Sequence, residues 1–377
     1  MSSSRPLFKP CFNAAIELIQ GWDAPFEFCH HISNDQDKTC SFLKTDSSKY
    51  TTSGTVSLIG PNFDLADVAA GLPELEAMLD ALPYKGGDVI AEDFHHVELE
   101  VGIQGGIRNG AANILAKKMA TLVMVLEESL LLKLVAPSRG RRIMHSVSKE
   151  SNVVKGPWPQ GGAVNSDYDS HVPPIAAMKP AAWNNRDPEH ICRILSKVWS
   201  ASQQELESIL KMRVFDCDFY MVVKTPELPR NWAQLPTSDP VFARPVDREQ
   251  GRTWFCFRHL QTTFEYTLLR NWVEVIARIV ELALAGPDEY KRCLEAIFRI
   301  QHDADQGGVT WEQLMTHVLK LEHRIQDWRD QLARYERGEI IAGLSEDGLL
   351  PKRMGPYYSQ KEDNTALLAR LRAKYPV

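Results

Sequence analysis

The spacing of apolar and polar residues changes several times along the chain, and each change predicts a different element. Helical spacing begins after Asn62 and stops at a Gly-rich turn. Residues 88–101 alternate between apolar and polar over their last six positions, as a half-buried strand does. The next run, residues 111–135, is apolar on most of its circumference and ends just before Pro137. We therefore expect a helix, a strand and a long buried helix in this order.

The second half of the chain predicts two more strands followed by helices. Residues 187–212 have helical spacing after an Asp-Pro start signal, and an internal Ser-Ala-Ser divides them. Residues 213–224 and 251–258 are rich in aromatic and β-branched side chains, which favours strands of one central sheet. From Phe264 onward the spacing is helical. The predicted fold class is α+β, with a central, mostly antiparallel sheet flanked by helices and a helical C-terminal third.

Two stretches lack this periodicity. Residues 1–60 are polar and broken by turn formers, which predicts a loop-rich entry segment. Residues 146–188 are dense in Pro, Gly, Asn and Ser, as in an active-site loop, a lid or an insertion, and we expect 149–174 to be a mobile cover. Together with a domain at 61–285 and a helical region at 286–377, these stretches complete the predicted organisation.

Composition and charge narrow the class of protein. The 377 residues are 44% hydrophobic, enough for a large core. The net charge of −6, from 43 basic and 49 acidic residues, argues against nucleic acid as a partner. Seven scattered cysteines without a C-x-x-C pair argue for a reducing compartment. Because no signal-peptide core or membrane-spanning run is present, we expect a cytoplasmic protein with no membrane partner.

The strand predicted near residues 95–102 carries the first candidate site. Successive side chains of a strand point to opposite sides, so His96, Glu98 and Glu100 share one face and the apolar residues between them share the other. Two carboxylates two residues apart suit a hard cation such as Mg²⁺, with the imidazole as a third ligand. An exposed polar face on an edge strand would show the same pattern.

Arginines at two places in the chain could bind an anionic ligand. Arg139 and Arg142 follow a Pro-Ser turn after the long apolar helix, and their forked donors match phosphate or carboxylate. The solvated C-terminus of a helix would carry similar cations. Arg258 shares a strand face with Cys256 and precedes a predicted helix, a position that favours anions.

In this order the segments resemble the amidoligases, which are glutamine-synthetase-like carboxylate–amine ligases. The stretch from His96 to Gly102, the apolar helix and the Pro-Ser-Arg turn at 137–139 are similar to the family's H-x-H-V-G strand, helix and P-S-R turn. The segment 253–280 resembles the family's T-x-E-F-R stretch, which is followed by a Thr, an acidic residue and a helix containing N/A-W-V. The resemblance extends from about residue 90 to residue 280.

The chain departs from the family pattern at three places. Glu98 and Glu100 stand where the family strand has two histidines, and Cys256 stands where it has Glu before Phe-Arg. Glutamates can hold magnesium, but a cysteine is a poor ligand for it. No early strand with the family's opening E-x-E pair is recognisable before residue 90. The strand 97–101 could itself be that opening strand, although the helix and the Pro-Ser-Arg turn after it favour the first alignment.

The resemblance implies a glutamine-synthetase-like fold and an ATP- and Mg²⁺-dependent ligase that forms amides. A carboxylate substrate, either a small molecule or a peptide, would attack the γ-phosphate of ATP, and an amine would capture the acyl phosphate. The metal ligands would be His96, Glu98 and Glu100. The residues facing ATP would be Arg139, Arg142 and Arg258, of which Arg139 and Arg258 would be catalytic.

Two other classes of protein remain open at this point. A catalytically degenerate amidoligase-like binding or scaffold protein would explain Cys256 and the missing E-x-E pair. An unrelated interaction protein built around the helical C-terminal third is the other alternative. The acid, the amine and the oligomeric state are not indicated by any motif.

Overall fold

The computed structural model describes residues 6–17, 41–45, 53–59, 63–76, 88–90, 96–104, 110–137, 145–156, 166–174, 176–178, 188–212, 217–223, 252–261, 263, 265–303 and 309–337. For the first four strands the description covers the backbone only. Among the described helices, none combines the length and the hydropathy that crossing a membrane requires.

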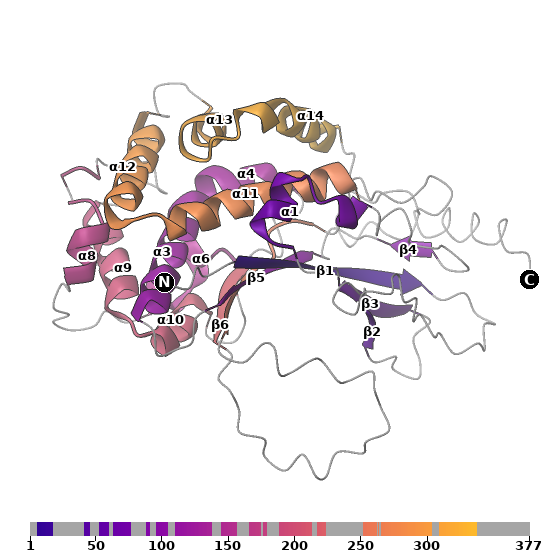
Figure 1. Ribbon diagram of the computed structural model, residues 1–377, viewed down its shortest axis with the longest axis horizontal. Coiled ribbons are helices and arrows are strands. Elements are labelled where there is room, and N and C mark those ends of the chain that lie inside the picture. Colours follow the sequence, from indigo (N-terminus) through magenta and orange to yellow (C-terminus); the bar gives the residue numbers. More distant parts are fainter. Residues whose placement is uncertain are drawn as a thin grey trace, which may run out of the picture.

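In the described part of the chain, seven strands form one antiparallel sheet, which lies below α1, α11 and α14 in Figure 1. The order across the sheet is β2-β3-β1-β5-β7-β6, and β4 pairs with β1. This architecture confirms the α+β prediction. The strands are β1 (Pro6–Glu17), β2 (Ser41–Thr45), β3 (Ser53–Ile59), β4 (Asp88–Ile90), β5 (Val97–Gln104), β6 (Phe219–Val223) and β7 (Arg252–Phe257).

The prediction of a loop-rich entry segment missed three strands in residues 1–60. Strand β1 pairs with β5 from Pro6↔Ile103 to Phe12↔Val97, and on its other side it pairs with β3. The entry segment therefore belongs to the same sheet as the candidate site. Two prolines in β1 cannot donate to a ladder, and the pairing partner lies far away in sequence. Local spacing could not reveal a strand of this kind.

One nearly continuous helical run packs on the sheet and confirms the buried helix predicted at 111–135. It consists of α3 (Gly110–Leu126), the π-helical turn η1 (Glu127–Leu131) and α4 (Leu132–Leu134). Helix α11 (Tyr266–Leu284) lies beside it (Figure 1). The other helices that lie wholly within the described residues are α1 (Leu65–Ala69), α6 (Val147–Glu150), α7 (Asn152–Lys155), α8 (Ser166–His171), α9 (Pro188–Ser200), α10 (Gln203–Leu210), α12 (Pro287–Asp303), α13 (Thr310–Gln313), η6 (Leu314–Val318), η7 (Glu322–Arg324) and α14 (Ile325–Glu336).

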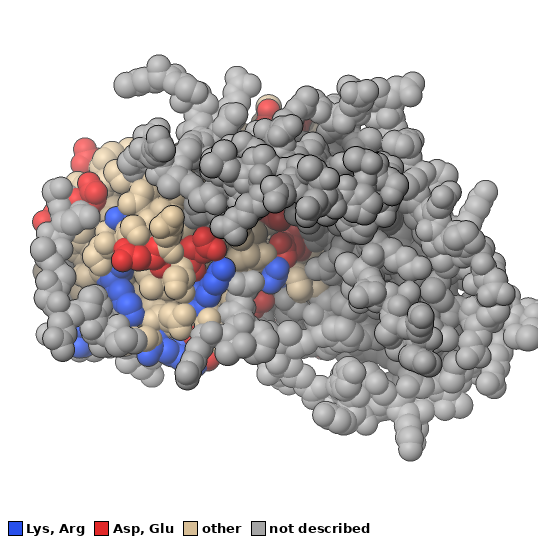
Figure 2. Space-filling view, turned by 90° about the horizontal axis from the view of Figure 1, so that it is seen from below, with Lys and Arg blue, Asp and Glu red and all other residues tan. Residues whose placement is uncertain are grey.

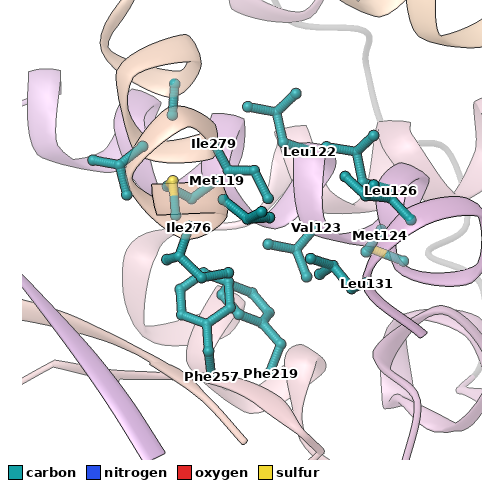
Figure 3. Close-up of a cluster of buried hydrophobic side chains, with 14 of the residues drawn as sticks. Met119, Leu122, Val123, Met124, Leu126, Leu131, Phe219, Phe257, Ile276 and Ile279 are labelled. Atoms are coloured by element: carbon teal, nitrogen blue, oxygen red, sulfur yellow. The ribbon is translucent and has the colours of Figure 1, made fainter. Parts of the chain in front are cut away.

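The core lies between the sheet and these two long helices. Phe219 of β6 and Phe257 of β7 are fully buried, with ring centroids 5.1 Å apart. Figure 3 shows the two rings below Met119 of α3 and Ile276 of α11. Each fully buried side chain of this size stabilises the fold by about 1.5–3 kcal/mol. One face of the sheet is thereby committed to packing, which leaves the opposite face for polar groups.

The segment predicted as a loop or lid is packed wherever the structure describes it. Residues 145–156 and 166–174 contain the short helices α6, α7 and α8, and Val147, Val153 and Val172 are buried among them. The two stretches therefore contain short helices and are not irregular loops, and their movement as a cover over a ligand stays a prediction. Buried valines lie in both stretches, and hydrogen bonds to the carboxylate of Glu127 hold residues 146–148, which turn-rich composition does not show. Residues 157–165 lie outside the described residues.

The break predicted inside residues 187–212 is confirmed. Helix α9 ends at Ser200 and α10 begins at Gln203, with Ser202 as its N-cap. The Ser202 hydroxyl accepts from the backbone N–H of Glu205, whose carboxylate accepts from the N–H of Ser202. This reciprocal cap starts a new helix.

Gly102 gives the ring of Trp254 room to lie across the sheet. The two residues are directly paired between β5 and β7, and a Cβ built on Gly102 would lie 2.7 Å from the ring. We expect Gly102→Ala to lower the free energy of unfolding by about 1–3 kcal/mol, because the ring or the strand must move. Urea denaturation checks this. Gly286→Ala is the control and should cost less, since its added Cβ meets no atom within 4 Å. Equal losses in the two variants would contradict the steric argument.

Candidate functional site on the polar face of the sheet

Three neighbouring strands bring the candidate residues into one row. Glu100 of β5 pairs with Cys256 of β7, and Cys256 pairs in turn with Tyr220 of β6. Paired residues of antiparallel strands share a face, and residues two positions along a strand share it too. Glu98 and Arg258 therefore lie on this face as well. The prediction that β5 and β7 place Glu98 and Arg258 on one side of a common sheet is confirmed.

Glu98 accepts hydrogen bonds from two neighbours on this face. Arg258 Nε lies 2.5 Å from Glu98 Oε2, and the Tyr220 hydroxyl donates to Oε1 at 2.9 Å. Arg258 Nη2 also donates to the Tyr220 hydroxyl at 2.7 Å, and its guanidinium carbon lies 4.4 Å from the centre of the Tyr220 ring. The three side chains form a closed triangle in which the charges of Glu98 and Arg258 are paired.

The triangle is mostly shielded from water but remains open at its edge. The side chain of Glu98 is 12% exposed and that of Arg258 is 27% exposed. Figure 2 views the molecule from the side of the sheet that faces away from α11, and acidic and basic residues lie next to one another on the described part of that side.

The local environment fixes the protonation states. Burial lowers the pKa of the Arg258 guanidinium, but the nearby Glu98 outweighs burial and raises it overall. Burial, followed by the charges of the two neighbouring glutamates, raises the pKa of the Cys256 thiol well above its usual value. Burial also raises the pKa of Tyr220 far above its usual value. At neutral pH the face therefore carries a charged Arg, a neutral thiol and a neutral phenol.

The residues predicted to hold a metal are brought close together. Ligand atoms of Glu98, Glu100 and Cys256 all lie within 4.8 Å of one another, and His96 Nε2 lies 4.0 Å from Glu98 Oε2. Carboxylate oxygens at this spacing fit a hard cation such as Mg²⁺. A protonated thiol does not fit such an ion, so Cys256 would be a neighbour of the cation and not its ligand.

Two predicted phosphate ligands cannot be placed. Arg139 and Arg142 lie outside the described residues, and the description of the preceding helical run ends at Pro137. Sequence reasoning in turn missed Tyr220, which closes the triangle with Glu98 and Arg258. The alternation of β6, extended by its pairing with Cys256, is the signal that could have found it.

Scans against family models, curated proteins and solved structures each returned no match to this chain. The resemblance to the amidoligases therefore rests on the sequence motifs around β5, α3 and β7.

Proposed function

We propose that the chain is an ATP- and Mg²⁺-dependent carboxylate–amine ligase, which forms an amide through an acyl phosphate on a small molecule or a peptide. The observation that supports this most directly is the meeting of Glu98, Glu100 and Arg258 on one partly open sheet face. Carboxylates for a cation and a forked cation for phosphate are the two groups that binding of ATP with Mg²⁺ needs. The resemblance of the surrounding segments to the amidoligases supplies the reaction class.

In the absence of nucleotide, Glu98 and Arg258 bind each other. The Glu98 carboxylate occupies the donors of Arg258 that a phosphate would take, and Arg258 occupies the oxygens that a cation would take. With nucleotide bound, Glu98 and Glu100 would hold the cation, with His96 beside them, and Arg258 would turn its fork to phosphate oxygens. The exchange keeps every charge paired, so it avoids the large cost of exposing an unpaired buried charge.

A second function has its own support. A binding or scaffold protein with the same fold would need no open metal site, and Cys256 stands as a neutral thiol between the two glutamates and Tyr220. In such a protein the Glu98–Arg258 pair would stay closed. The two functions differ in whether nucleotide with Mg²⁺ stabilises the fold.

The ligase proposal predicts that ATP with Mg²⁺ raises the melting temperature of the wild-type protein. A ligand at one hundred times its Kd stabilises the folded state by about 2.7 kcal/mol. Arg258→Lys should lose most of this gain, because an ammonium keeps the charge but lacks the planar fork. Differential scanning calorimetry with and without ATP and Mg²⁺ measures it. Arg329→Lys is a matched control, since it alters a bidentate arginine of α14 that contacts Glu312.

The outcome separates the two functions. Wild-type protein without nucleotide-dependent stabilisation, and without ATP turnover across a broad panel of acids and amines, would refute the ligase and favour the binding protein. Equal loss of the gain in Arg329→Lys and Arg258→Lys would show a general effect of arginine replacement.

A further inference from the structure

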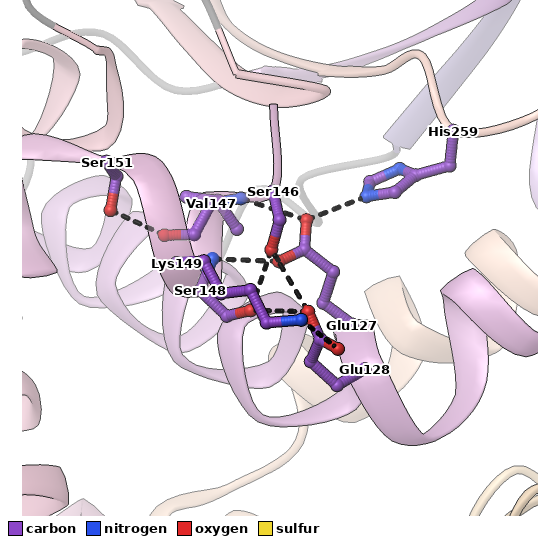
Figure 4. Close-up of polar contacts among 8 residues, drawn as sticks. All are labelled: Glu127, Glu128, Ser146, Val147, Ser148, Lys149, Ser151 and His259. Carbon is purple, nitrogen blue, oxygen red and sulfur yellow. Dashed lines mark hydrogen bonds and ion pairs between the residues drawn. The ribbon is translucent and has the colours of Figure 1, made fainter. Parts of the chain in front are cut away.

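A fully buried carboxylate lies at the point where the long buried helix changes to π-helical geometry. Glu127 is the first residue of η1 and has no exposed surface. It accepts hydrogen bonds from the backbone N–H of Val147 at 3.0 Å and of Ser148 at 2.8 Å, and from the Ser146 hydroxyl at 2.6 Å. His259 Nε2 donates to the same carboxylate at 3.1 Å (Figure 4). Isolated π-helical turns of this kind are frequent at functional sites.

His259 connects this interior cluster to the sheet face. Its ring is fully buried and lies between the rings of Phe257 and Trp272, at centroid distances of 6.4 and 6.2 Å. The residue before it is Arg258, whose side chain lies on the opposite side of the chain, against Glu98. A hydrogen bond that fixes His259 therefore also fixes the backbone that carries the guanidinium.

A second connection runs through the backbone. The N–H of Arg258 donates to the carbonyl of Asp218 at 2.7 Å, and the N–H of Asp218 donates to the carbonyl of His145 at 2.9 Å. His145 directly precedes Ser146, which binds Glu127. Asp218 lies two residues before Tyr220, so both partners of Glu98 are tied to the same interior group. The cluster and the face form one closed ring of contacts.

Stability alone does not explain a charged group at this position. The side chain of Glu127 is completely desolvated, and a buried ion pair is often no more stabilising than well-packed apolar residues of the same volume. The charged carboxylate fixes the positions of its hydrogen-bond donors, because only one orientation of the group satisfies all of them. Glu127 can therefore hold residues 146–148 and His259 in fixed positions relative to one another.

We propose that Glu127 and His259 are positioning residues, which hold the Arg258 guanidinium in place against Glu98 and Tyr220 on the other side of the sheet. The inference rests on the proposed function only in treating that face as a ligand site. The placement itself follows from the contacts and can be measured without any ligand.

The test reads the Nε–H of Arg258 by NMR in protein labelled with ¹⁵N-arginine and otherwise deuterated. Its signal is assigned by its loss in Arg258→Lys, and its hydrogen-exchange rate reports the bond to Glu98. We expect Glu127→Gln to raise this rate at least about tenfold, relative to backbone amides of α12, as local opening does. Glu128→Gln should change it less than about twofold. Glu128 is the control because it is the next residue of η1. It contacts Lys149 at the surface and accepts only longer hydrogen bonds from the Ser146 and Ser148 hydroxyls, at 3.3 and 3.5 Å, and it does not contact His259.

A second pair of variants decides the question if Glu127→Gln does not fold. His259→Gln keeps an N–H that can reach the carboxylate, whereas His259→Leu removes it, so only the leucine variant should release the Arg258 signal. Unchanged exchange in Glu127→Gln, or equal exchange in the two His259 variants, would overturn the positioning role. Because no nucleotide is present, these results are independent of the ligase test.

Discussion

Replacing Glu127 by alanine is expected to lower the free energy of unfolding by about 3–5 kcal/mol, the largest loss among the changes considered for this chain. The variant would leave the Ser146 hydroxyl, the N–H groups of Val147 and Ser148, and His259 Nε2 without the acceptor that now serves all four. Unpaired donors in a dry interior are costly, and the removed side chain also leaves a cavity.

The stabilising effect of Glu127 should depend on pH in one direction. Burial raises the pKa of this carboxyl, but its hydrogen bonds and the nearby His259 outweigh burial, so the pKa in the folded state lies below the ordinary value of 4.5. A carboxyl with a depressed folded pKa contributes its stability above the unfolded pKa, and loses it as the pH falls through the folded pKa. The difference between wild type and Glu127→Ala should therefore be full at neutral pH and shrink below about pH 4.5.

Urea denaturation at a series of pH values measures both effects. Glu128→Ala is the control, because its partly exposed contact with Lys149 and its long hydrogen bonds from the Ser146 and Ser148 hydroxyls should together contribute about 1 kcal/mol at most. A difference between wild type and Glu127→Ala that grows on acidification would contradict the depressed pKa. A loss no larger than that of Glu128→Ala would contradict the role of the buried network.

The parts of the fold that could be predicted are those whose signal is local. Strand β5 shows alternation within a few residues, β7 is rich in aromatic side chains, and the run from α3 to α4 shows a continuous apolar surface. Strand β1 lacks such a signal, since prolines interrupt it and its partners lie far along the chain. Its existence follows from pairing, which a single sequence does not display.

The residues of the candidate site also differ in whether a local sequence signal could predict them. Strand alternation placed Glu98, Glu100 and Arg258 on one face, and the register between β5 and β7 agrees. Tyr220 was missed because no motif surrounds it. The Glu127 cluster was missed because its donors include backbone N–H groups of a segment with loop composition. The acidic pair Glu127-Glu128 inside a largely apolar run is a trace of it in the sequence.

Replacing Arg258 by alanine is expected to lower the free energy of unfolding by about 3 kcal/mol. A clamp that only binds phosphate would leave the ligand-free protein almost unaffected. Here the guanidinium pairs with Glu98, whose side chain is 12% exposed, so its removal leaves a largely buried carboxylate with only the Tyr220 hydroxyl among these partners. The remaining exposure of both side chains places the loss at the lower end of the range for buried pairs.

A double-mutant cycle separates pairing from other effects of the substitution. Glu98→Gln removes the charge that Arg258 balances, so adding Arg258→Ala to it should cost less than Arg258→Ala alone, with a coupling energy of about 1–3 kcal/mol. Chemical denaturation of the four proteins gives this value. The exposed pair Arg329–Glu312 is the matched comparison and should show weaker coupling. A coupling energy near zero would contradict the closed pair.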